Sequence, residues 1–83
     1  MMELARSPNQ IGNIIRRARK RRAWTQTQLA DQAGLRQETI SLIEAGHPAA
    51  KLDTILVILA ALDLEFQIAP RSKGETGAIE DIF

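Results

Sequence analysis

The stretch from residue 25 to residue 46 limits the possible fold of this chain more than any other; it reads TQTQLADQAGLRQETISLIEAG. Thr25 and Gln28 have the spacing of a capping box, in which the threonine hydroxyl accepts from the N–H of residue 28 and the glutamine side chain accepts from the N–H of residue 25. Gly34 and Gly46 each follow a short apolar face, where glycine takes left-handed backbone without a Cβ penalty and ends a helix. The stretch therefore predicts two short helices joined by a tight turn, the second from about residue 36 to residue 45.

Two further helices are expected on either side of this pair. Upstream, either Ser7 or Asn9 can cap a helix, and an apolar stripe at helical spacing follows in Ile11, Ile14, Ile15 and Ala18. Downstream, residues 52–62 form a helix that is apolar on more than one side. We expect one side to face the domain core and another, including Leu59 and Leu62, to face a second copy of the chain.

Residues 64–70, LEFQIAP, change to the alternating pattern of a β-strand, with Leu64, Phe66 and Ile68 on one face. The rest of the sequence offers no second strand to pair with it. One interpretation is antiparallel pairing with its own copy across a two-fold axis, which would satisfy the backbone groups of an unpaired edge. The other is a C-terminal extension that lies on the domain unpaired.

Composition sets limits on the class of protein. The chain has 83 residues, no cysteine and one histidine, His47, which is enough for one small domain without disulfides. Its longest apolar run, residues 55–62, is far shorter than the roughly 20 residues that span a bilayer. We expect a cytoplasmic protein. We expect no membrane, metal, cofactor or small-molecule ligand, and no enzyme activity, because no catalytic or metal-binding cluster is present.

Charge is distributed unevenly along the chain. Residues 1–24 carry seven basic and one acidic side chain, a net +6, whereas residues 25–62 sum to −2 and residues 63–83 to −3, which together give the net charge of +1. A basic head and an acidic tail suggest two different partners, although a solvated helix face would have the same composition.

The stretch thus combines a helix, a glycine turn and a second helix with a polar outer edge. This is the helix-turn-helix arrangement, in which the second helix enters the DNA major groove. Arg36 can bind guanine through two hydrogen bonds, and Gln37 can do the same with adenine. Leu42 either contacts a thymine methyl group or joins the core. The expected base-reading residues are Arg36, Gln37, Thr39, Ser41 and Leu42, and the expected phosphate-binding residues are Thr25, Gln26 and Lys51.

The same residues resemble the Cro/phage-repressor (XRE) class of helix-turn-helix proteins. The similarity covers about residues 8–64 and rests on WTQ at 24–26, LA at 29–30, AG at 33–34, QETIS at 37–41 and IEAG at 43–46. It implies a mostly α, four- to five-helix, lambda-repressor-like domain and a structural ion pair between Arg19 and Glu44. The chain departs from the class at Arg36, where a Ser or Thr often caps the recognition helix.

A single repressor-like domain (residues 1–63), one dimerisation strand (64–70) and a flexible tail (71–83) resemble the HipB-type antitoxins. The resemblance implies a homodimer that binds a palindromic DNA operator, represses its own operon and holds a HipA-like serine/threonine kinase toxin. The apolar tail residues Ile79, Ile82 and Phe83 are then candidates for toxin binding. Two alternatives are a stand-alone Cro/repressor-type regulator without a toxin and a protein-interaction adaptor; the base-reading set argues against the adaptor.

Overall fold

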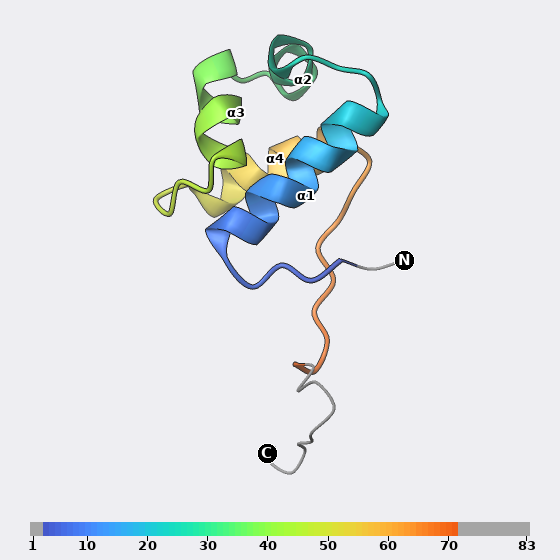
Figure 1. Ribbon diagram of the computed structural model, residues 1–83, viewed down its shortest axis with the longest axis vertical. Coiled ribbons are helices and arrows are strands. Elements are labelled where there is room, and N and C mark those ends of the chain that lie inside the picture. The colour runs from blue at the N-terminus through green and yellow to red at the C-terminus, as the bar shows by residue number, and fades with distance from the viewer. Residues whose placement is uncertain (1–2, 72–83) are drawn as a thin grey trace.

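The computed structural model describes residues 3–71, which contain four helices (Figure 1). They are α1 (Pro8–Arg21), α2 (Gln26–Ala33), α3 (Gln37–Glu44) and α4 (Leu52–Ala61). α3 packs against both α1 and α2, and α2 also packs against α4. The mostly α fold of four to five helices expected from the sequence is confirmed. Within residues 3–71, no helix is both long and apolar enough to cross a membrane.

Local hydrogen bonds explain where the first two helices begin and end. Ser7 caps α1 by accepting from the backbone N–H of Gln10 at 3.1 Å, so the structure selects Ser7 over Asn9. The capping box forms at α2: the Thr25 hydroxyl accepts from the Gln28 N–H at 3.0 Å, and the Gln28 side chain accepts from the Thr25 N–H at 2.8 Å. Gly34 then ends α2 with a φ of 70°. These local signals set the start of α1 and both ends of α2 before any core packing is considered.

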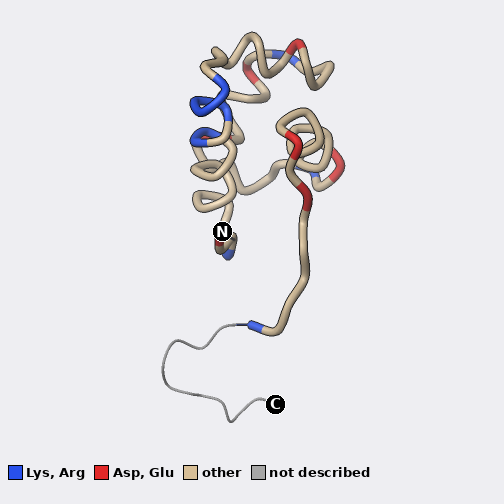
Figure 2. The backbone as a smooth tube through the Cα atoms, turned by 90° about the vertical axis from the view of Figure 1, so that its right-hand side faces the viewer, with Lys and Arg blue, Asp and Glu red and all other residues tan. Residues whose placement is uncertain are grey.

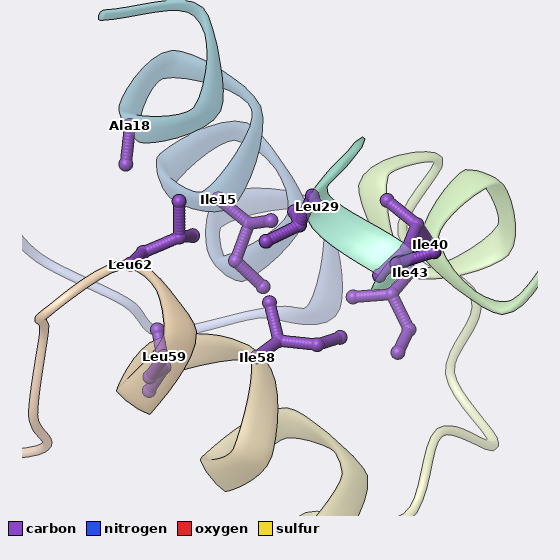
Figure 3. Close-up of a cluster of buried hydrophobic side chains, with 9 residues drawn as sticks. Ile15, Ala18, Leu29, Ile40, Ile43, Ile58, Leu59 and Leu62 are labelled. Carbon is purple, nitrogen blue, oxygen red and sulfur yellow. The ribbon is translucent and has the colours of Figure 1, made fainter. Parts of the chain in front are cut away.

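The core of the domain draws on all four helices (Figure 3). Ile15, Leu29, Ile40 and Ile58 have no exposed surface and come one from each helix. The remaining buried apolar residues are Ala18, Ala30, Ile43, Leu59 and Leu62. Because α3 is anchored through Ile40 and Ile43, its opposite face is held outward.

α1 approaches the end of α3 closely enough that only glycine fits at the crossing. A Cβ added to Gly12 would lie 2.4 Å from the carbonyl oxygen of Ile43 and 2.7 Å from that of Glu44. Both contacts are with backbone, which cannot move aside as a flexible side chain can. Gly12 therefore sets the distance between α1 and the last turn of α3.

The expectation that Leu59 and Leu62 face a second chain needs correction. They are only 6% and 3% exposed in a single chain, because their side of α4 packs into the core. The apolar surface that α4 leaves outward belongs to Leu52, Leu56 and Val57, which are 63%, 45% and 43% exposed. These three are the large apolar side chains that α4 offers to a partner.

Beyond α4 the chain runs away from the helices in an extended path (Figure 1). The N–H of Leu64 donates to the carbonyl of Leu59 at 2.8 Å, and the Leu64 side chain packs against the core. Phe66 is 40% exposed and Ile68 fully exposed. No strand occurs between residues 3 and 71 of this one chain, so strand pairing between two chains stays a prediction. Ile79, Ile82 and Phe83 lie outside the described residues.

Candidate nucleic-acid interface

The outward face of α3 carries the side chains expected to read bases. Glu38 and Leu42 are exposed one turn apart, with Gln37 and Ser41 beside them on the same side of the helix. Thr39 and Ser41 are half-buried at the edges of this face. Leu42 is 53% exposed, so it does not join the core, and its methyl groups remain available to a thymine methyl.

Arg36 occupies the N-cap position of α3. It has extended backbone and makes no side-chain cap hydrogen bond, because a guanidinium has only donors and cannot accept from a helix N–H. The side chain is exposed at the end of the helix that a groove-binding mode would place nearest the bases. The missing cap thus leaves a cation at the reading end of α3.

The structure brings Arg19 and Glu44 together beneath α3. Arg19 Nε donates to Glu44 Oε2 at 2.7 Å and Arg19 Nη2 donates to Glu44 Oε1 at 2.9 Å, while Nη1 donates to the backbone oxygen of Trp24 at 2.8 Å. Arg19 is 8% exposed and Glu44 6%. The hydrogen bond to Glu44 raises the pKa of Arg19 above its usual value, against the opposing effect of burial. The pair ties α1, the α1–α2 corner and α3 to one another.

Gln26 connects this ion pair to the surface of α3. Its Nε2 donates to Glu44 Oε1 at 3.2 Å, and its Oε1 accepts from Gln37 Nε2 at 2.6 Å. The phosphate role expected for Gln26 thus competes with two contacts inside the protein. Sequence reasoning assigned Gln26 and Gln37 to separate tasks and missed their contact. The sequence carried one signal for this contact. Glutamine is the first residue of both α2 and α3, and buried Glu44 beside them can accept from further donors.

The other two expected phosphate contacts lie at helix starts. Thr25 is the N-cap of α2, and its hydroxyl can still donate its own proton while it accepts from Gln28. Lys51 is the exposed N-cap of α4. Helix N-termini attract anions through their unpaired N–H groups and the helix dipole, which suits both positions for phosphate.

Positive charge gathers on α1, as Figure 2 shows for the backbone positions of Lys and Arg. The exposed cations are Arg16, Arg17, Lys20, Arg21 and Arg22. Glu3 forms ion pairs with Arg17 and, at 3.8 Å, with Arg21, and the Arg22 guanidinium lies 5.0 Å from the centre of the Trp24 ring. Exposed pairs of this kind contribute little stability. In the described part of the chain, no group of three His, Cys, Asp or Glu residues could hold a metal ion.

Comparison with known proteins agrees with this geometry. The helix-turn-helix family model matches residues 15–68. Antitoxin HipB of Escherichia coli O6:H1 strain CFT073 is 32% identical over 74 residues, covering 89% of this chain and 79% of HipB. A solved structure described as a HipB-O4 20mer complex has a TM-score of 0.79 at 31% identity, covering 86% of this chain and 100% of its own. A HipA-HipB-O2-O3 complex has a TM-score of 0.77 at 32% identity, with the same two coverages.

The match spans α2 and α3 together with the core that holds them, so the chain belongs to the helix-turn-helix family of DNA-binding proteins. The similar proteins define its place within that family more closely. The chain belongs to the HipB antitoxin family.

Proposed function

We propose that this protein is the antitoxin of a type II toxin–antitoxin pair, a homodimer that binds a palindromic operator, represses its own operon and neutralises a HipA-like serine/threonine kinase toxin by binding it. The observation that carries the proposal is the outward face of α3, whose N-terminal end presents Arg36 and Gln37 while its back is fixed by the core. Two such helices in a dimer would read major grooves about one helical turn, roughly 34 Å, apart.

The toxin half of the proposal rests on similar proteins and on the composition of the tail. One similar structure is described as a complex containing both HipA and HipB. This chain ends in the sequence AIEDIF, in which three large apolar side chains follow a polar, glycine-containing segment. A short apolar peptide of this kind gains most by ordering on a partner surface. Ile79, Ile82 and Phe83 are therefore the proposed toxin contacts.

The DNA half is tested with Gln37→Ala on the DNA site that in vitro selection from a random library yields for the wild-type protein. We expect specific binding to weaken by about 1–3 kcal/mol. Gln32→Ala is the matched control, because Gln32 is an exposed glutamine on α2. If Gln37→Ala bound the selected site as tightly as the wild type, α3 would not read DNA as proposed.

The toxin half is tested by co-purification from the native host followed by mass spectrometry. We expect a HipA-like kinase to copurify with the full chain and to be lost when residues 79–83 are deleted, while DNA binding is retained. If no kinase copurified and DNA binding was intact, the chain would be a stand-alone repressor. A kinase that copurified equally well with the truncated chain would place toxin binding elsewhere on the domain.

A further inference from the structure

The segment that precedes α1 turns back and runs beside that helix (Figure 1). At the turn, the backbone N–H of Arg6 donates to the side chain of Gln10. The segment then reaches the C-terminal half of α1, where the Glu3 carboxylate forms ion pairs with Arg17 and, at 3.8 Å, with Arg21. One acidic side chain of the N-terminal segment is thus held by two cations of the helix that follows it.

Arg17 and Arg21 lie one turn apart on the outer side of α1, opposite buried Ile15. Their side chains are 54% and 62% exposed with Glu3 in place. Two side chains four residues apart on a helix are neighbours on its surface. A guanidinium presents its donors in a planar fork that matches carboxylate and phosphate equally. The two arginines therefore form an anion site, and Glu3 is the anion that the chain itself supplies.

This anion site continues the surface that the proposed function assigns to DNA phosphate. Arg21 is the last residue of α1 and lies four residues before Thr25, the N-cap of α2. The corner between them is tight, because the Trp24 N–H donates to the carbonyl of Arg19 at 3.2 Å. Figure 2 shows basic positions of α1 reaching the end of the helix, next to α2. A duplex that meets the start of α2 therefore passes close to the two arginines.

Two further cations adjoin the site. Arg16 and Lys20 are exposed one turn apart, and neither is paired with an acidic side chain among residues 3–71. The outer side of α1 thus carries four cations against the single carboxylate of Glu3, an excess of three positive charges. The DNA backbone is a regular row of negative charges, and it binds cationic surfaces by releasing its condensed counterions. The phosphate backbone is therefore the ligand that this charge pattern fits.

We propose that Arg17 and Arg21 form a binding site for a backbone phosphate of DNA, and that Glu3 occupies this site and lowers the sequence-independent affinity of the chain for DNA. The inference rests on the proposed function, in which the chain binds DNA. Phosphate contacts position a protein on the duplex but carry no sequence information. With the site covered by Glu3, base contacts supply a larger share of the binding energy.

The test is Glu3→Gln in the full chain, which keeps the shape of the side chain and removes its charge. Binding is measured to the duplex selected in vitro from a random library and to an unrelated duplex of equal length. Each added phosphate contact steepens the slope of log affinity against log salt by about 0.9. For one new contact, the gain of Glu3→Gln over the wild type should be about threefold larger at about 50 mM salt than at about 200 mM, on both duplexes.

Two comparisons separate a phosphate site from a general change in net charge. Asp31→Asn makes the same change in charge at an exposed position of α2 and should leave the salt slope unchanged. Arg17→Gln/Arg21→Gln removes the site, so Glu3→Gln added to this double variant should give no gain. Thermal unfolding of Glu3→Gln should match the wild type, because ion pairs between exposed groups contribute little stability.

The outcomes distinguish this inference from the proposed function. If Glu3→Gln bound both duplexes as the wild type does, or if its gain persisted without the two arginines, the phosphate site would be wrong. If Glu3→Gln altered only the binding of a copurified kinase, the arginines would form a protein interface and the proposal would be overturned. Failure of the proposed function has a different result: Gln37→Ala would bind the selected duplex as tightly as the wild type, whatever Glu3→Gln does.

Discussion

Replacing one partner of the buried ion pair should destabilise this domain more than any surface change. Arg19→Met removes three hydrogen bonds, two to Glu44 and one to the Trp24 carbonyl. It leaves a carboxylate that is 6% exposed, to which, among residues 3–71, only the Gln26 amide still donates. Breaking a buried pair on one side costs about 3–5 kcal/mol, because the remaining charge has lost both water and its counter-ion.

That cost is large for a chain of this size. Domains have a free energy of unfolding of about 0.05–0.15 kcal/mol per residue, which gives about 4–12 kcal/mol for 83 residues. A domain of this length loses roughly 4–8 °C of Tm per kcal/mol, so Arg19→Met should lower the Tm by between about 10 and 40 °C. Urea unfolding measures the change in free energy, and thermal unfolding measures the change in Tm, each followed by far-UV circular dichroism. All variants are compared at one protein concentration, because dimerisation adds stability.

The double variant Arg19→Met/Glu44→Met separates the unpaired charge from the loss of packing. Two well-packed apolar residues in place of a buried pair are often neutral or stabilising, so the double variant should recover most of the lost free energy. A single variant that lost less than about 1 kcal/mol, or a double variant no more stable than the single, would refute the reasoning about the buried charge.

Three further changes test other parts of the structure. Thr25→Ala removes one half of the capping box at α2 and should cost about 1 kcal/mol of unfolding free energy in urea titration, and no loss would mean that the cap contributes nothing. Gly12→Ala should force α1 away from α3, lower the free energy of unfolding by about 1–3 kcal/mol and weaken DNA binding. Asn13→Ala, at the exposed neighbouring position, should do neither. Equal unfolding midpoints for the two variants would contradict the tight crossing. Phe66→Asp should convert the dimer to a monomer in sedimentation. Gln67→Asp, on the other face of the extended segment, should leave the dimer intact. If the dimer survived Phe66→Asp, the interface would lie elsewhere.

Much of the fold was predictable because its signals are local. Capping depends on hydrogen bonds between residues three apart, and the glycine that ends α2 depends on its own backbone angles. The apolar stripe of α1 and the back of α3 likewise follow from helical spacing alone. The outward placement of Arg36 and Gln37 follows as the remainder of that pattern. The pattern left the side of Leu42 open, and only the structure places it outward.

Only the tertiary structure decided which of several apolar surfaces of a helix faces the core. In α4, nearly every side is apolar, and periodicity cannot say that Leu59 and Leu62 face inward while Leu56 and Val57 face outward. That choice depends on how α4 packs against the other helices, since the sequence of α4 permits more than one inward side.

The sequence by itself determined a helix-turn-helix with a polar reading edge, through caps, turns and spacing that act within a few residues. It did not determine how that edge is held. Gln26 meets Gln37 across eleven positions and Glu44 across eighteen, and Gly12 meets the end of α3 across a still longer separation. Such contacts form only once packing has brought the groups within about 3 Å of one another. Local sequence patterns cannot specify that packing.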